Sequence, residues 1–171
     1  MSDKTSAGPK AGRPDWPKGY GIPKDKKGLL PWSHAAERLE QAINYWVCTV
    51  RPDGRPHAVP VWGIWVDNAF YYSGGPDTCH MRNVASNPNV GVHLESGGDV
   101  VIVEGIARVM EPANHDLAER LAAASNAKYG KLGHTTTAAD YEKGGMISVS
   151  PKTVLAWVSF PKDVTRWQFE S

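Results

Sequence analysis

The stretch from Tyr45 to Met110 constrains the fold more than any other part of the chain. It alternates short runs of β-branched and aromatic residues with turn signals, and a single short helical segment that ends at Asn87-Pro88 interrupts it. Successive strands joined by tight turns are typical of an antiparallel sheet that closes on itself. The segment contains neither a metal-ligand cluster nor a nucleophile triad, and the pattern predicts a small β-barrel.

The chain has 171 residues, of which 41% are hydrophobic, so we expect one domain with a sizeable core. Residues 1–31 are rich in Pro, Gly and Lys and lack periodicity. They carry seven Lys or Arg against three Asp, whereas the whole chain has a net charge of only +1. We expect an extended basic arm over residues 1–31 and one cofactor-binding domain over residues 32–171. A solvated tail is the simpler interpretation of the arm, and an anionic partner is the alternative.

Cys48 and Cys79 are the only cysteines, and two thiols cannot build a disulfide framework. No signal peptide and no apolar run of membrane-spanning length is present, so we expect a cytoplasmic protein without a membrane span. The arm has no interleaved aromatic residues beyond Trp16 and Tyr20, and the body is mildly acidic. Nucleic acid is therefore not an expected partner.

The predicted fold is mainly β with flanking helices, in a six- to seven-stranded antiparallel barrel. Ser33 and Thr78 are the expected N-caps of the first two helices, and Asp67-Asn68 suits a two-residue primed turn. Residues 127–145 are expected to form a loop. The predicted strands are 45–51, 56–66, 69–73, 89–95, 100–110, a hairpin of 146–150 with 154–159 across Pro151-Lys152, and 165–169; the predicted helices begin at 33, 78 and 113.

Two features of the second predicted strand point toward a ligand. Pro60 cannot donate to a sheet ladder, so the strand is either bulged or unpaired there, which frees backbone for a ligand, or it is an edge strand without one. Trp62 and Trp65 flank Gly63 and should face opposite sides of the sheet, where one could stack on a flat ring. A core role is the commoner one for such aromatic residues.

The loop from Ser73 to Thr78 is a weak candidate for a phosphate-binding site. It is rich in glycine, opens a predicted helix, and has Arg82 one turn into that helix. Any glycine-rich helix cap has the same appearance, so this signal needs support from elsewhere. The six histidines are scattered, and none lies at metal-ligand spacing from Cys, Asp or Glu, so no metal site is predicted.

Several segments together resemble the pyridoxamine 5'-phosphate oxidase-like split barrels, and more closely their flavin/deazaflavin oxidoreductase branch. The matching segments are TVRPDGRPHAVPVWGIW, FYYSGGP, RNVASNPNV, HLESGGDVVIVEG, AKYG and FPKDVTRWQF, spread over residues 32–169. The resemblance implies a split-barrel homodimer with cofactor sites between the protomers, occupied by FMN or coenzyme F-420.

The resemblance also assigns a cofactor-binding set position by position. The strand that carries Pro60 would lie along the cofactor ring, the segment after Tyr72 would approach the ring and ribityl chain, and the start of the next helix would hold the phosphate. His93 would border the groove, and the C-terminal segment would lie near the ring. The implied set is His57, Val59, Pro60, Val61, Trp62, Tyr72, Ser73, Thr78, His80, Arg82, Asn83, His93, Arg166 and Trp167.

One departure from the family pattern favours coenzyme F-420 over FMN. Thr78-Cys79-His80 stands where many relatives have Ser-Arg-Lys, so two fixed cations are replaced by a thiol and an imidazole. The leading hypothesis is hydride transfer from the reduced deazaflavin to a small conjugated substrate, with Tyr72 as first candidate for the proton donor. The alternatives are an FMN-dependent reductase or oxidase and a non-catalytic dimer that binds a cofactor or other ligand.

Overall fold

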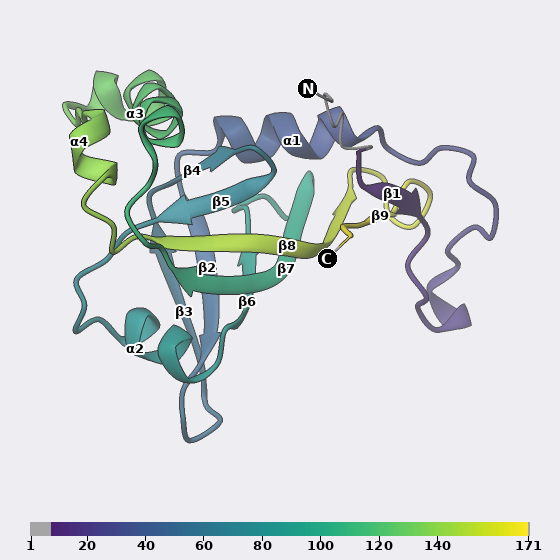
Figure 1. The fold of residues 1–171 in the computed structure, drawn as a ribbon. Helices are drawn as coiled ribbons and strands as arrows, with labels where there is room; N and C mark the ends of the chain where they lie inside the picture. Colours follow the sequence, from purple (N-terminus) through teal and green to yellow (C-terminus); the bar gives the residue numbers. More distant parts are fainter. Residues whose placement is uncertain (1–7, 171) are drawn as a thin grey trace.

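The computed structural model describes residues 8–170, which are built around one antiparallel sheet of nine strands (Figure 1). The strands follow the order β1-β9-β8-β7-β6-β2-β3, while β5 pairs with β8 and with β4. β3 and β4 are consecutive in the chain but do not pair, so the barrel is not closed between them. The predicted antiparallel, mainly β architecture is confirmed, with nine strands rather than six or seven.

The strands are β1 (Lys10–Gly12), β2 (Tyr45–Val50), β3 (Pro56–Val61), β4 (Gly63–Val66), β5 (Ala69–Tyr72), β6 (Asn89–His93), β7 (Val100–Val109), β8 (Ile147–Trp157) and β9 (Thr165–Gln168). The α-helices are α1 (Trp32–Gln41), α2 (Cys79–Ser86), α3 (His115–Tyr129) and α4 (Ala138–Tyr141), and two short 3-10 turns are η1 (Lys18–Tyr20) and η2 (Gly130–Leu132).

The predicted strand 56–66 is broken at Trp62 into β3 and β4. β3 pairs with β2, whereas β4 turns away to pair with β5. A Cβ atom at Gly63 would lie closer than 3.0 Å to the Phe70 ring and to the Tyr71 carbonyl oxygen. Only glycine lets the two strands approach this closely, and the break follows from that close approach.

The predicted hairpin across Pro151-Lys152 is wrong, because β8 runs through this dipeptide as one long strand. The register against β7 shifts there, so that Gly105 lies opposite Pro151 while Glu104 lies opposite Thr153. Lys152 is the extra residue of a β-bulge, which accommodates the missing N–H of proline without ending the strand.

Two helical predictions also need correction. α1 begins after Pro31, which occupies the N-cap position predicted for Ser33. The segment 127–145, predicted as a loop, contains the end of α3, η2 and the short helix α4. A capping box in which Thr137 and Asp140 bond each other's backbone N–H starts α4, a signal present in the sequence but overlooked.

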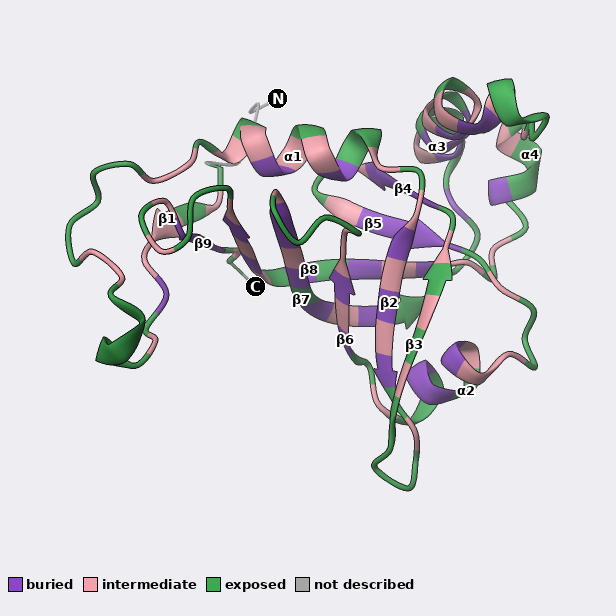
Figure 2. Ribbon diagram, turned by 180° about the vertical axis from the view of Figure 1, so that it is seen from behind, coloured by how far each residue is buried: buried purple, intermediate pink, exposed green. Residues whose placement is uncertain are grey.

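The core lies inside the curved sheet, and α1 and α2 close it. Buried and exposed residues alternate along the strands, as Figure 2 shows by colour. Ala35 and Leu39 of α1 and Val84 of α2 join the same buried cluster as the inward-facing strand residues. A second cluster forms where α3 and α4 pack near β4 and β5.

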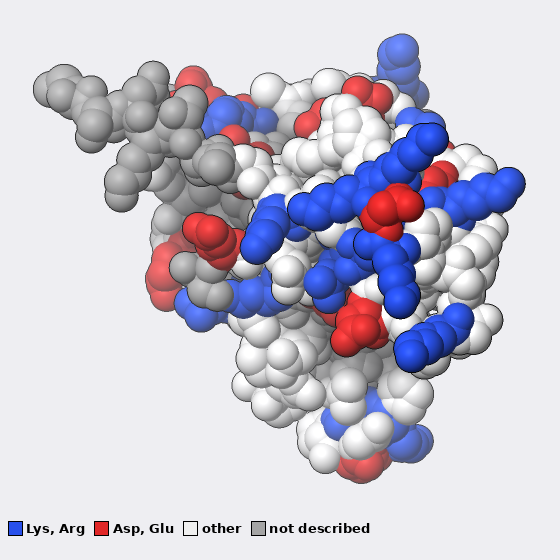
Figure 3. All heavy atoms as spheres, turned by 90° about the vertical axis from the view of Figure 1, so that its right-hand side faces the viewer, with Lys and Arg blue, Asp and Glu red and all other residues white. Residues whose placement is uncertain are grey.

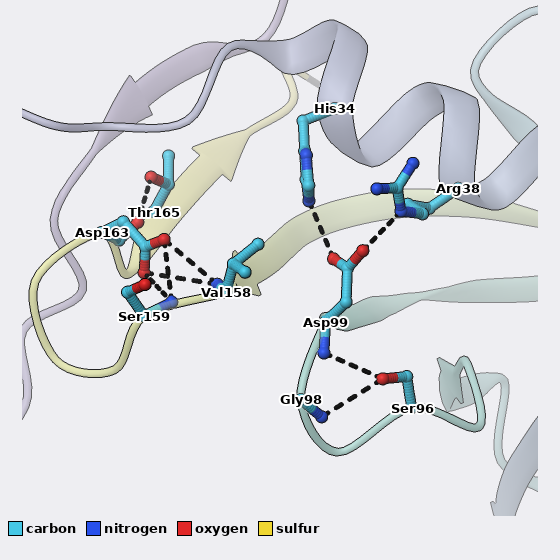
Figure 4. A network of polar contacts seen from close by, with 9 residues as sticks. All are labelled: His34, Arg38, Ser96, Gly98, Asp99, Val158, Ser159, Asp163 and Thr165. Atoms are coloured by element: carbon cyan, nitrogen blue, oxygen red, sulfur yellow. Dashed lines mark hydrogen bonds and ion pairs between the residues drawn. The ribbon is translucent and has the colours of Figure 1, made fainter.

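A polar network fixes α1 to the turn between β6 and β7 (Figure 4). The Asp99 carboxylate lies 2.9 Å from His34 Nε2 and accepts a hydrogen bond of 2.5 Å from Arg38 Nε. Partial burial opposes ionisation of Asp99, but the bonds from Arg38 and His34 outweigh it and lower the pKa of the carboxyl. Asp99 is therefore charged at neutral pH and ties the two elements together.

Candidate functional site

Four of the predicted site residues, His57, Tyr72, His80 and Asn83, converge with Gly74 where β3, the end of β5 and α2 meet. This region, here called the β3–α2 corner, also includes the neighbouring Ser73, Thr78 and Arg82. The side chain of Asn83 donates a 2.9 Å hydrogen bond to Thr49 Oγ1, and Thr49 lies directly opposite His57 in the β2–β3 pair. This bond between buried groups anchors α2 against the sheet. It sets the position of the turn of α2 that carries His80.

His80 projects from the first turn of α2 into this corner and is only 7% exposed. Its ring centroid lies 5.7 Å from that of Tyr72, and its Nε2 lies 3.3 Å from Thr78 Oγ1. Burial, and to a lesser degree the nearby His57, lower the pKa of His80. The imidazole is therefore neutral at pH 7, and it can accept or donate one hydrogen bond at each nitrogen according to its tautomer.

Gly74 is required where the loop passes over this imidazole. A Cβ atom at Gly74 would lie closer than 3.0 Å to His80 Nε2, whereas one at Gly75 would meet its nearest neighbour, Thr78 Cγ2, at an ordinary 3.7 Å. The two adjacent glycines therefore differ in function. Gly74 keeps the loop and the imidazole in contact, and Gly75 tolerates a side chain at this spacing.

Two buried polar side-chain atoms within residues 8–170 have no hydrogen-bond partner, and they are the Tyr72 hydroxyl and Arg166 Nε. Tyr72 is 1% exposed, and burial raises the pKa of its hydroxyl to about 12, so the group stays protonated and can donate. An unpaired buried polar group costs about 1–3 kcal/mol. Both atoms are therefore available to a partner that the described chain does not itself supply.

The segment predicted to hold a phosphate is partly engaged with itself. Thr78 donates from both its backbone N–H and its hydroxyl to the Gly75 carbonyl, and the exposed Arg82 donates from Nη1 to the Asp77 carbonyl. Arg82 retains further N–H donors that face solvent. Ser73 is exposed at the start of the same loop. The corner thus offers an anion the long, exposed cationic side chain of Arg82, hydroxyl groups and the neutral imidazole of His80.

The register of the sheet places the remaining predicted residues on two faces. His57, Val59 and Val61 are half-buried and share the inner face with the core residues opposite them in β2. Pro60 points the other way and is exposed on β3, which is an edge strand of the described sheet. The structure therefore favours the edge-strand interpretation of Pro60, with no bulge at this position.

Pro60 begins one continuous row on the outer face, here called the outer row. Pairing across β3, β2, β6, β7, β8 and β9 links its members, which are Pro60, Trp46, His93, Ile102, Leu155 and Arg166. All of these side chains are exposed or half-buried. Trp167, adjacent to Arg166, faces the core and is 1% exposed. The unpaired Arg166 Nε thus lies at one end of the outer row and Pro60 at the other.

Trp62 lies outside both groups, at the break between β3 and β4. Its ring is 45% exposed and stacks on Tyr129 with a centroid distance of 4.6 Å and an interplanar angle of 9°. The Tyr129 hydroxyl in turn lies 2.8 Å from both the N–H and the carbonyl oxygen of Gly63. A small cleft of about 60 Å³ adjoins this stack and also contacts Tyr72 and Ser73.

The half-buried Lys128 and the buried Tyr45 form a pair that the sequence did not reveal. Lys128 Nζ donates to the Tyr45 hydroxyl at 2.6 Å and to the Gly63 carbonyl oxygen at 3.1 Å. Burial lowers the pKa of Lys128 to about 8, although Glu40 opposes the shift. Lys128 and Tyr129 both hydrogen-bond to the backbone of Gly63. The AKYG segment, residues 127–130, therefore holds the strand in place where β3 ends and β4 begins.

In the described part of the chain, no group of three or more His, Cys, Asp or Glu side chains could hold a metal ion. Within the same residues, no helix is both long and apolar enough to cross a membrane. The donors gathered at the β3–α2 corner are hydroxyls, an amide, an imidazole and a guanidinium, which suit an organic anion.

Comparison with solved structures finds the same fold in several proteins. An F-420 reductase is 24% identical, with a TM-score of 0.53, and the match covers 69% of this chain and 93% of that one. General Stress Protein 26 from Bacillus anthracis is 19% identical, with a TM-score of 0.56 and coverages of 77% and 95%. The heme storage protein HutZ from Vibrio cholerae is 14% identical, with a TM-score of 0.52 and coverages of 67% and 85%.

Comparison with curated proteins finds no match. The family model described as pyridoxamine 5'-phosphate oxidase matches residues 32–158, which is most of the chain. The resemblance read from the sequence is confirmed, and the open antiparallel barrel is the split barrel of this family. The chain belongs to the pyridoxamine 5'-phosphate oxidase family.

Proposed function

We propose that this chain is an oxidoreductase that binds coenzyme F-420 at the β3–α2 corner and transfers a hydride to a small conjugated substrate. One observation carries the proposal. The two buried polar atoms left without partners within residues 8–170, Tyr72 OH and Arg166 Nε, both belong to the cofactor-binding set that the resemblance implied. The similar F-420 reductase structure supports the choice of coenzyme.

The donors present fit an elongated anionic cofactor. Tyr72 would donate a hydrogen bond to the cofactor, Thr78, His80 and Arg82 would hold its phosphate, and Asn83 would keep the α2 turn in place through Thr49. When bound, the coenzyme supplies the hydride chemistry. The pKa of about 12 makes Tyr72 a weak acid at neutral pH, so its first role is to orient the ring, and proton donation is its second.

The charge of the corner favours a deazaflavin coenzyme over FMN. A dianionic phosphate monoester prefers fixed cations, each charge-assisted bond contributing about 1.5–3 kcal/mol. Here His80 is neutral at pH 7 because burial lowers its pKa, and Arg82 is exposed. A coenzyme whose negative charge is spread along a tail depends less on this one position. FMN remains the alternative cofactor.

A second copy of the chain is part of the proposal, because one chain does not form a large enough site. Ligand pockets usually measure about 300–1,000 Å³, whereas the cleft beside Tyr72 and Trp62 measures about 60 Å³. The outer face carries the outer row and an adjoining groove of about 510 Å³ beside Cys48 and Ile106. We propose that two outer faces meet in a homodimer and that the partner chain completes the cofactor site at the β3–α2 corner.

The second candidate function is non-catalytic ligand binding. The likeness to a heme storage protein and the high pKa of Tyr72 favour it.

We further propose that the chain divides into an arm (1–31) and a cofactor-binding domain (32–171). We also propose a reducing, cytoplasmic setting, in which the free thiols Cys48 and Cys79 persist.

Equilibrium titration of the purified chain with coenzyme F-420 and with FMN tests the proposal. We expect micromolar or tighter binding of F-420, and weaker binding of FMN. Gly74→Ala should weaken F-420 binding about tenfold or more by displacing His80, while the matched Gly75→Ala should leave it unchanged. Tight FMN binding with no F-420 binding would overturn the choice of coenzyme, and equal effects of the two glycine variants would overturn the site.

Hydride transfer distinguishes the two candidate functions. Reduced F-420 bound to the protein should be oxidised faster by a conjugated enone or quinone than reduced F-420 free in solution. Binding without any acceleration by a panel of such acceptors would favour the non-catalytic alternative. Ala58→Glu, an exposed outer-face change on β3, should yield a monomer that has lost binding.

A further inference from the structure

The second half of the arm and the loop between β8 and β9 form one protruding surface, here called the arm surface (residues 16–27 and 158–162). It lies at the end of the molecule opposite α3 and α4 (Figure 1). None of the residues of the β3–α2 corner or the outer row belongs to it. Any role of the arm surface is therefore independent of the proposed function.

Aromatic rings from both segments hold the arm surface together. The Trp16 ring lies 5.9 Å from that of Trp157 and 6.3 Å from that of Phe160, and the Tyr20 ring lies 6.2 Å from that of Phe160. Trp16 is half-buried, whereas Tyr20 is 54% exposed and Val158 is 47% exposed. The arm surface thus contains three large, exposed apolar side chains, those of Tyr20, Val158 and Phe160.

The backbone beneath these side chains is held in place. Arg13 donates to the carbonyl oxygens of Asp25, Lys27 and Val164, so one guanidinium joins both ends of the arm loop to the sheet. β1 pairs with β9 immediately before this point. The Asp163 carboxylate accepts from the backbone N–H groups of Val158 and Ser159, which closes the neighbouring loop (Figure 4). The arm surface is therefore preformed.

The arm surface carries more positive than negative charge. Lys and Arg side chains gather on this end of the molecule in the space-filling view (Figure 3). Asp25 is the one acidic residue of the arm surface, and it already accepts a hydrogen bond from the N–H of Lys27. The exposed cations of the arm surface are Lys18, Lys24, Lys26, Lys27 and Lys162.

We propose that the arm surface docks the protein onto a lipid bilayer that contains anionic headgroups. Exposed aromatic and aliphatic side chains with exposed lysines in the same two segments match the two layers of a membrane interface, where rings enter the headgroup level and ammonium groups meet the phosphates. The association is peripheral, since within residues 8–170 no helix could span the bilayer.

The arrangement of the rings argues for a bilayer over a nucleic acid. Stacking of bases needs flat ring faces that are free on at least one side. The rings here meet edge to face, at 86° for Tyr20 with Phe160 and 80° for Trp16 with Trp157, and they form a compact cluster instead of a row of parallel faces along which a strand could stack its bases. The exposed Val158 has no role in base stacking, but it adds apolar area that a bilayer can cover.

Co-sedimentation of the full chain with lipid vesicles tests this proposal. Vesicles of phosphatidylcholine with about one-third phosphatidylserine should bind the protein, and vesicles of phosphatidylcholine alone should bind it at least tenfold less. Raising the salt from about 0.1 M to about 0.5 M should weaken binding markedly because it screens the lysines. The quadruple variant Lys18→Gln, Lys24→Gln, Lys26→Gln, Lys27→Gln should lose more than a hundredfold, at about fivefold per lysine.

The double variant Tyr20→Ser, Val158→Ser separates docking from charge attraction alone, and should bind about tenfold less tightly at unchanged net charge. The matched control, also at unchanged net charge, is Leu132→Ser, an exposed apolar residue at the opposite end of the molecule, and this variant should bind like the parent. Thermal melting checks that each variant folds. Equal binding to both kinds of vesicle, no effect of the arm variants, or tighter binding to duplex DNA than to vesicles would overturn the proposal.

Discussion

The two ends of the sheet differ in how their polar groups are satisfied. At the β1–β9 end, Arg13 uses three N–H groups on three carbonyls, and Asp163 accepts from two backbone N–H groups. At the β3 end, the Tyr72 hydroxyl is buried without a partner, and His80 is buried and uncharged. The first end is joined by these bonds, although Arg166 Nε on the outer face of β9 has no partner there, and the second end holds a buried hydroxyl and a neutral imidazole that a ligand can use.

The largest expected effect lies at the β1–β9 end. Arg13→Gln should remove charge-assisted bonds to three carbonyls and destabilise the arm and β1 by about 2–3 kcal/mol. Amide hydrogen exchange of β1 and β9 should accelerate correspondingly. Arg82→Gln is the matched change at the other end, where an exposed side chain makes one bond, and stability there should change by less than about 0.5 kcal/mol. Similar losses for both arginines would break the comparison.

Tyr72→Phe should have opposite effects on stability and on binding. Removing an unpaired buried hydroxyl should stabilise the unliganded protein by about 1 kcal/mol, raising Tm by a few degrees. The same change should weaken F-420 binding about tenfold, because the cofactor would lose its donor. Differential scanning calorimetry and titration on the same samples check both signs. A fall in Tm would show that the hydroxyl is satisfied within the protein.

Asp99→Asn should cost about 1 kcal/mol at neutral pH, because it removes the charged acceptor of His34 and Arg38. The pKa of Asp99 is lower in the folded state than its ordinary value of 3.8. Its contribution is therefore fully present above about pH 4 and is lost as the pH falls through the folded-state value. Urea unfolding at several pH values should show that the variant loses less stability than the parent below about pH 4.

His80 gives the smallest expected effect, a shallow loss of stability on mild acidification. Burial and His57 lower its pKa below the ordinary value of 6.5, so the unfolded chain binds the proton first. Stability from this group is complete above about pH 6.5 and falls as the pH drops toward the folded-state pKa. His80→Gln should flatten the pH dependence of unfolding between pH 5 and pH 6.5 by less than about 1 kcal/mol. An unchanged slope would show that His80 does not titrate there.

Local signals in the sequence predicted local structure well. Asp67 and Asn68 both have positive φ, at 53° and 58°, as a two-residue primed turn requires. Thr78 stands at the N-cap of α2, and Asn87 follows the last residue of this helix, as expected. Pro151-Lys152 was misread because a turn and a bulge use the same residues, and only the length of the partner strand β7 decides between them.

The site residues were predictable one by one, but their arrangement was not. Whether Pro60 and Arg166 share a face depends on pairing across six strands, and no local pattern contains that register. The same applies to Lys128, whose amine reaches Tyr45 from a helix far along the chain. Sequence reasoning identified the donors of the β3–α2 corner, and the fold separated them from the residues of the outer row.

A crystal structure of the full chain grown with coenzyme F-420 is the most direct test of the central claim. The account predicts a dimer joined through the outer faces, with the cofactor at the β3–α2 corner, Tyr72 OH and Arg166 Nε hydrogen-bonded to cofactor or partner, and the phosphate beside His80 and Arg82. A monomer, or a cofactor bound elsewhere while Tyr72 OH remains unpaired, would contradict it.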